Sequence, residues 1–92
     1  MTVPKGVWGL VTEGESKGCK VIVDPGELGG WDILLYPPAP SDDVWNYWAD
    51  DDTELDYFFT PGPPRGDPPA WVWPGLLPKV EWGVTPPEGD RA

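Results

Sequence analysis

The sequence predicts an α+β domain, in which a small antiparallel sheet carries two short helices on one face. Four apolar runs rich in β-branched and aromatic residues are bounded by Gly and Pro, which is typical of strands. Two further segments place apolar residues at i, i+3 and i+4, which is typical of short helices. The 92 residues, with seven Trp, three Tyr and two Phe, are enough for one small domain spanning 1–92.

The strands are expected near residues 7–12, 19–24, 31–36 and 80–84. The second and third form a hairpin, because the runs Lys20 to Val23 and Trp31 to Tyr36 flank a turn-rich connection from Asp24 to Gly30. The first three strands make a meander. Residues 80–84 add a C-terminal strand whose alternate residues Val80, Trp82 and Val84 face the core.

The helices are expected near residues 42–49 and 54–59, with Ser41 and Thr53 as their N-caps. Pro61 ends the second helix. The interpretation is two short helices, or one helix bent at the aspartates between them. Their apolar faces are Val44, Tyr47 and Trp48 in the first helix, and Leu55, Phe58 and Phe59 in the second.

The segment 60–78 is predicted to be a long Pro-rich loop, because its seven Pro exclude ladder pairing over most of its length. Its second half also contains Trp71, Val72, Trp73, Leu76 and Leu77. We therefore expect the second half to lie on the domain and the first half to be exposed. Residues 85–92 are polar and predict a frayed tail.

Acidic residues dominate the middle of the chain. The formal net charge is −10, and no Lys or Arg lies between Val21 and Pro64. We therefore do not expect nucleic acid or anionic membranes as direct partners. A basic protein partner, or a role in solubility, fits the negative charge. The acids of this span are Asp24, Glu27, Asp32, Asp42, Asp43, Asp50, Asp51, Asp52, Glu54 and Asp56.

Cysteine usage and the N-terminus predict a cytoplasmic protein. Cys19 has no second cysteine with which to form an internal disulfide, and it is interpreted as a small packing residue. The N-terminal residues do not read as a signal peptide, and no run approaches the ~20 apolar residues of a membrane helix.

The residue types argue against an enzyme and against a cofactor. The chain has no His, so nucleophile–His pairs and zinc sites cannot be built. A carboxylate pair such as Asp32 with Asp56 is conceivable, but chance pairs are common in so acidic a chain. At Asp50, Asp51 and Asp52, a solvated turn between helices is favoured over a Ca²⁺ or Mg²⁺ site, because the spacing does not match a calcium loop.

Two further short motifs have ordinary explanations. Gly29 and Gly30 lack the flanking pattern of a phosphate loop and fit a turn. The Arg65-Gly66-Asp67 tripeptide of adhesion ligands is interpreted as a chance match in a Pro-rich loop.

Trp45 is the aromatic residue with two open placements. It lies off the predicted apolar helix face, so it is either an exposed anchor beside dense acid or packed under the Pro-rich loop against Trp71 or Trp73. An exposed Trp in such a place is typical of an interface hot spot.

Several motifs occur in an order that resembles a known group. Gly29 to Leu34 reads Gly-Gly-aromatic-x-Ile-Leu, and Asp42 to Trp45 reads as an acidic helix start with a Trp. Leu55 to Phe58 reads Leu-x-Tyr-Phe, and Val80 to Trp82 reads Val-x-Trp. Over about half of the chain this resembles the small acidic bacterial immunity proteins of polymorphic toxin systems.

That resemblance implies a cytoplasmic inhibitor that binds a cognate toxin domain and blocks its active site. The charge agrees, since an acidic surface accelerates association with a basic toxin. The alternatives are a structural or regulatory interaction module, or a DNA-mimic inhibitor. The predicted partner-binding residues are Asp43, Trp45, Asp50, Asp51, Asp52, Glu54 and Asp56.

Overall fold

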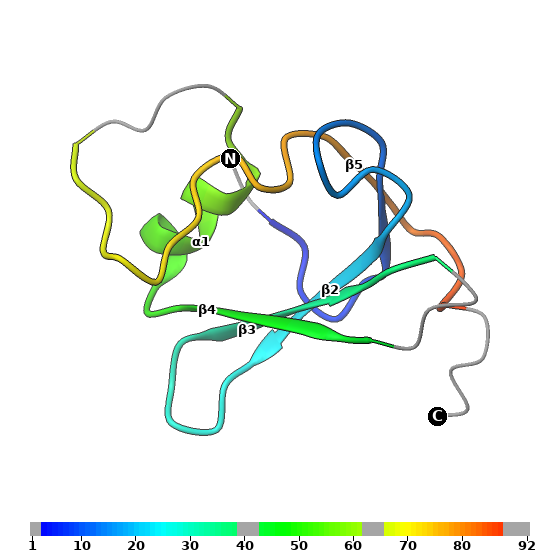
Figure 1. Cartoon of the computed structure of the whole chain (residues 1–92). Coiled ribbons are helices and arrows are strands. Elements are labelled where there is room, and N and C mark those ends of the chain that lie inside the picture. Colours follow the sequence, from blue (N-terminus) through cyan, green and yellow to red (C-terminus); the bar gives the residue numbers. More distant parts are fainter. Residues whose placement is uncertain (1–2, 39–42, 62–65, 88–92) are drawn as a thin grey trace.

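Five strands and one helix form within the residues that the computed structural model describes, which are 3–38, 43–61 and 66–87. The strands make one antiparallel sheet in the order β4-β3-β2-β1-β5 (Figure 1), so the fold class is α+β as predicted. In chain order the elements are β1 (Gly9–Val11), β2 (Lys20–Pro25), β3 (Trp31–Tyr36), β4 (Trp45–Ala49), α1 (Asp52–Phe59) and β5 (Val80–Trp82).

The hairpin of β2 and β3 is the longest paired unit and confirms the sequence expectation. Its register pairs Val21 with Leu35 and Val23 with Ile33. All four of these side chains are buried on the same face, because alternate residues of a strand point to the same side. This face therefore forms the floor of the core.

The first predicted helix, 42–49, is wrong: the structure has β4 at Trp45–Ala49, paired antiparallel with β3. Asp42 and the predicted N-cap Ser41 lie outside the described residues. The spacing of Val44, Tyr47 and Trp48 suggested a helical period. In the strand, Tyr47 and Ala49 instead face the core with a period of two, and Val44 is exposed. Aromatic-rich sequence favours a strand once a neighbouring strand offers pairing, which the local pattern did not show.

The second predicted helix exists as α1, but it begins earlier than expected. Its N-cap is Asp51, not Thr53, and the Asp51 side chain accepts a hydrogen bond from the backbone N–H of Glu54. The predicted apolar face is confirmed, since Leu55, Phe58 and Phe59 are all buried.

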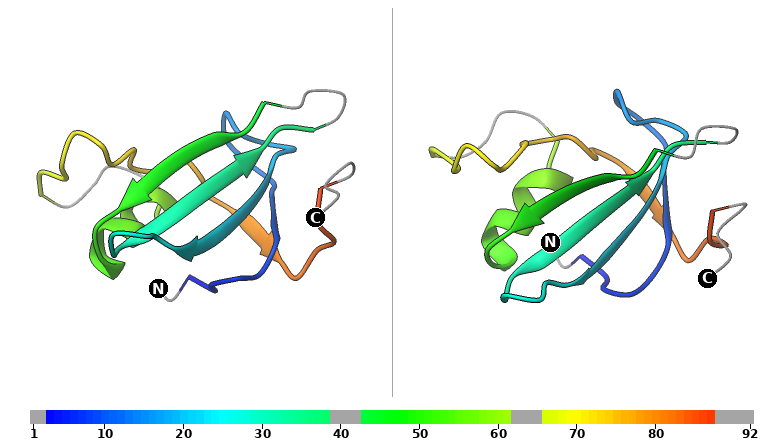
Figure 2. Two further views of the ribbon diagram at one scale, coloured as in Figure 1. Left: turned by 90° about the horizontal axis from the view of Figure 1, so that it is seen from below. Right: turned by 60° about the horizontal axis from the view of Figure 1, so that its bottom comes forward.

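α1 lies beside β4 (Figure 2), and its aromatic side chains reach both edge strands of the sheet. At one edge, the Tyr47 ring of β4 lies 5.9 Å from the ring of Phe58. At the other, the Trp82 ring of β5 lies 5.7 Å from that of Phe59. Side chains of this one helix therefore pack against both edges of the sheet.

The described part of the Pro-rich segment, residues 60–61 and 66–78, contains neither helix nor strand. Val72, Leu76 and Leu77 are buried in the core. The N–H of Leu77 donates to the Phe58 carbonyl at 2.9 Å, which satisfies an acceptor that the end of α1 leaves unpaired. The second half of the segment thus lies on the domain.

The predictions for residues 62–65 and for the tail beyond residue 87 lie outside the described residues. Before that point, the Lys20 ammonium donates to the carbonyls of Thr85 at 2.8 Å and Pro86 at 3.2 Å. Within the described ranges, no helix has the length and apolar character that crossing a membrane requires.

Candidate protein-interaction surface

The predicted partner-binding residues cluster around β4, which is an edge strand of the sheet. Asp43 and Trp45 lie at its start, and Asp50 and Asp51 follow its end. At about 3.3 Å per residue, the two ends of the strand are separated by roughly 15 Å. One interface of ordinary size, about 800 Å² on each partner, can span that distance.

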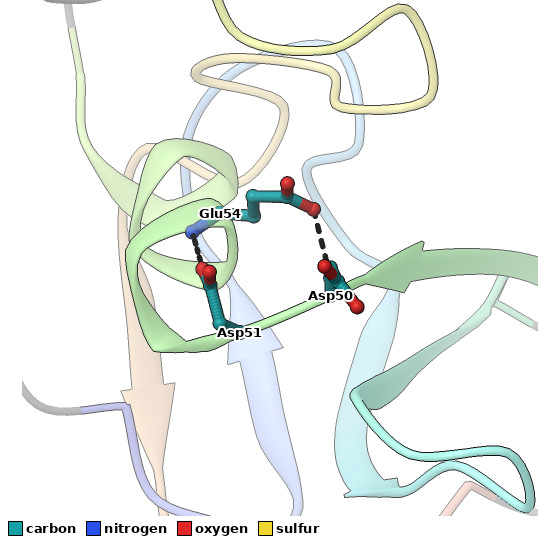
Figure 3. Close-up of side chains that lie close together, drawn as sticks. All are labelled: Asp50, Asp51 and Glu54. Carbon is teal, nitrogen blue, oxygen red and sulfur yellow. Dashed lines mark hydrogen bonds between the residues drawn. The ribbon is translucent and has the colours of Figure 1, made fainter.

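The acids after β4 form the turn that starts α1, and Figure 3 shows their arrangement. Asp51 Oδ1 accepts from the N–H of Glu54 at 2.9 Å, while Glu54 Oε1 accepts from the N–H of Asp50 at 2.8 Å. This reciprocal pattern is a variant of the capping box. The negative carboxylates also interact favourably with the positive end of the helix dipole. The turn predicted between two helices is therefore a strand-to-helix turn.

Helix capping accounts for this acidic cluster. Oxygen atoms of Asp50, Asp51 and Glu54 lie within 4.8 Å of one another, which is close enough to surround a cation. However, Ca²⁺ takes six to eight oxygen ligands, and the oxygens of Asp51 and Glu54 already accept hydrogen bonds from the backbone. The cluster carries no metal assignment.

Asp52 and Glu54 also hold two tryptophan side chains in place. Trp31 Nε1 donates to Asp52 Oδ1 at 2.9 Å, and Trp71 Nε1 donates to Glu54 Oε1 at 2.9 Å. Lys5 Nζ lies 3.5 Å from Asp52 Oδ1 and 4.7 Å from the centre of the Trp31 ring. The chain thus already binds one of its own cations between a Trp face and a carboxylate.

Trp45 takes the exposed one of its two placements, with 54% of its surface accessible. The rings of the Pro-rich segment pair with its neighbours in β4. Trp71 lies 5.7 Å from Trp48, and Trp73 lies 6.2 Å from Tyr47 at an interplanar angle of 90°. Trp71 and Trp73 are themselves half-exposed, each at 50%.

We call this assembly the β4-edge surface. Sequence reasoning named Trp71 and Trp73 as possible packing partners of Trp45, but it did not include them among the partner-binding residues. A helical interpretation of 42–49 also hid the edge strand itself. Its members are Asp43, Trp45, Asp50, Asp51, Asp52, Glu54, Trp71 and Trp73.

Asp56, the last of the predicted partner-binding residues, lies in α1 and is half-buried. Its backbone carbonyl accepts from the Thr60 hydroxyl at 2.7 Å. Its role in partner binding stays a prediction.

A hollow of about 410 Å³ opens beside Trp45. It lies between β3, β4, the β1–β2 connection and the Pro-rich segment. Its lining residues are mainly aromatic and aliphatic, and the two acidic ones, Glu15 and Asp43, are both exposed. Among the residues that the structure describes, the lining is Glu15, Ser16, Cys19, Leu35, Pro37, Asp43, Trp45, Tyr47, Trp73 and Leu76.

Burial raises the pKa of the Cys19 thiol in this hollow above its ordinary value of 9.0. The pKa of the Tyr47 hydroxyl is also raised, first by burial and then by the neighbouring Cys19. Both groups are therefore neutral at pH 7. A neutral, half-buried thiol is a poor nucleophile, which agrees with a packing role for Cys19.

Comparison with known proteins identifies no relative: the chain matches no protein-family model, no curated protein and no solved structure.

Proposed function

We propose that this chain is a protein-binding module whose β4-edge surface docks a basic partner. The observation that carries the proposal is the position of Trp45, half-exposed on an edge strand with acids at both of its ends. A large, rigid aromatic side chain loses little conformational entropy on binding, and such a side chain is typical of the centre of a binding hot spot. Surrounding carboxylates would accelerate the approach of a positively charged protein.

The sequence also supports a positively charged partner. The span from Val21 to Pro64 has no basic residue and includes most of the β4-edge surface. The resemblance to small acidic immunity proteins adds a biological role, in which the basic partner is a toxin domain and binding occludes its active site. We infer that role as the specific function, with a structural or regulatory interaction as the alternative.

The test begins with a bait prepared from the full chain. The bait captures its partner from the native host, and binding rates are then measured with the purified partner. Replacing Asp50, Asp51 and Asp52 with Asn should slow association several-fold at low salt and much less at high salt, because exposed charges act through screened, long-range attraction. Asn caps a helix as well as Asp does, so α1 is kept.

A matched control replaces Glu13, Asp67 and Glu81, which lie outside the β4-edge surface, with Gln or Asn. It changes the net charge by the same amount and should slow association less. Association rates that are equal for the two triple variants, or an acidic partner, would show that the charge serves solubility and not docking.

Trp45→Ala should act on the dissociation rate, costing about 2 kcal/mol or more if the ring is a buried anchor. That corresponds to dissociation roughly 30-fold faster. The toxin role has its own readout: co-expression of the chain should relieve growth arrest caused by the captured partner, and Trp45→Ala should relieve it less. A partner that causes no arrest, yet binds with this pattern, would favour the structural or regulatory alternative.

A further inference from the structure

The hollow beside Trp45 has walls suited to a cation. Trp45 and Trp73 are both half-exposed and line it together with Tyr47. The rings of Tyr47 and Trp73 meet at 90°, so two aromatic surfaces form a corner. The faces of aromatic rings carry partial negative charge, and a corner of such rings attracts positively charged groups.

The floor of the hollow is apolar. Leu35 and Leu76 are buried there, and Pro37 adds a further aliphatic surface. A small charged ion would gain nothing from this floor. A long side chain gains from it, because Lys and Arg carry their charge on a stem of methylene groups that packs on apolar surface.

The charges of the lining agree with a cationic occupant. Glu15 and Asp43 are exposed carboxylates on the lining, and none of the ten lining residues within the described part of the chain is basic. Lys5, over the Trp31 ring and beside Asp52, shows a cation of this chain held by two components, an aromatic face and a carboxylate. The hollow likewise has aromatic rings on the same lining as the exposed Glu15 carboxylate.

We propose that this hollow binds a basic side chain of the partner, held between the Trp45 and Trp73 rings with its charge toward Glu15. The assignment deepens the proposed function and rests on it for biological meaning. An aromatic groove can also bind a Pro-rich segment, whose neutral rings would use the walls but not the carboxylates. The two occupants differ in their dependence on charge, which the test exploits.

The test uses the full chain and a short probe, acetyl-Gly-Arg-Gly-amide, followed by nuclear magnetic resonance of the tryptophan indole N–H signals. These signals are assigned with single Trp→Phe variants. We expect the Trp45 and Trp73 signals to shift and to saturate with a dissociation constant on the order of 1 mM, as suits so small a ligand. The same peptide with citrulline, a neutral group of the same shape, should bind at least about fivefold more weakly.

Two protein variants test whether the Glu15 carboxylate contacts the charge of the bound arginine. Glu15→Gln should weaken binding of the arginine peptide several-fold at low salt, whereas Glu81→Gln, which makes the same change on β5 at the opposite edge of the sheet, should leave it unchanged. Glu15 and Glu81 are both exposed, so the fold is retained in each variant.

Four results would overturn the assignment. Equal binding of the arginine and citrulline peptides, or tighter binding of a proline-rich peptide, would mean that the hollow selects shape. Equal shifts at Trp8 and Trp31 would mean diffuse attraction to an acidic protein. No shift at tens of millimolar probe would mean no site. Because the probe needs no partner, each result leaves the test of the β4-edge surface independent.

Discussion

Replacing Glu54 with Ala should loosen the β4-edge surface without unfolding the domain. One oxygen of this side chain, Oε1, accepts from the backbone N–H of Asp50 at 2.8 Å and from the indole N–H of Trp71 at 2.9 Å. It therefore connects the end of β4, the first turn of α1 and the Pro-rich segment. Removing the carboxylate leaves both donors to find water.

The expected loss of unfolding free energy is about 2–3 kcal/mol. A hydrogen bond to a charged group contributes about 1.5–3 kcal/mol, and partial exposure of Glu54 places each of its two bonds at or below the low end. A carboxylate in the first turn of a helix adds roughly 0.3–1 kcal/mol. For a domain of this size, the loss corresponds to a fall in Tm of roughly 10–20 °C.

Denaturant melts measure the free energy, and solvent exchange of the indole proton reports on Trp71. Glu54→Gln keeps an oxygen acceptor and should lose about half as much. Thr53→Ala, at the exposed neighbouring position, is the control and should stay within about 0.5 kcal/mol of the original. If Glu54→Ala loses no more free energy of unfolding than Thr53→Ala, and solvent exchange of the Trp71 indole proton is unchanged, the carboxylate does not hold these elements together.

Two further predictions concern the core and the hollow. Phe58→Ala should destabilise the domain by about 3–5 kcal/mol, because Phe58 is fully buried between α1 and the sheet; a loss below about 1 kcal/mol in denaturant melts would contradict its core position. Cys19 has a raised pKa, so folding disfavours its thiolate. Alkylation of Cys19 at pH 8 should thus be slower in the folded chain than in urea, and equal rates would show that the thiol is freely accessible. The contribution of Cys19 to the free energy of unfolding should be full below pH 9 and should fall as the pH rises further.

The sequence alone predicted the elements whose pattern is local. The two apolar runs Lys20 to Val23 and Trp31 to Tyr36, with the turn-rich connection between them, identified the hairpin. The spacing of Leu55, Phe58 and Phe59 identified the apolar face of α1. The acidic span and its lack of basic residues were likewise visible without a structure. Composition and short-range periodicity determine these features, so no distant contact was needed to find them.

The tertiary structure decided what residues 43–49 become. Their apolar spacing fits a helix, yet β3 offers a pairing edge, and aromatic residues gain from cross-strand packing in a sheet. Gly9 is a second example, because a methyl group there would meet the side chains of Val80 and Trp82, which lie across from it. Neither contact is visible in the local sequence.

The candidate surface shows the same division. Sequence reasoning found Asp43, Trp45 and the aspartates after β4, since acid density and an unplaced Trp are properties of the chain itself. It did not find Trp71 and Trp73, which join the surface only because the Pro-rich segment folds back on β4. The proline residues show that this segment cannot pair in a sheet, but they do not show where on the domain it lies. Its position depends on long-range contacts with α1 and the core.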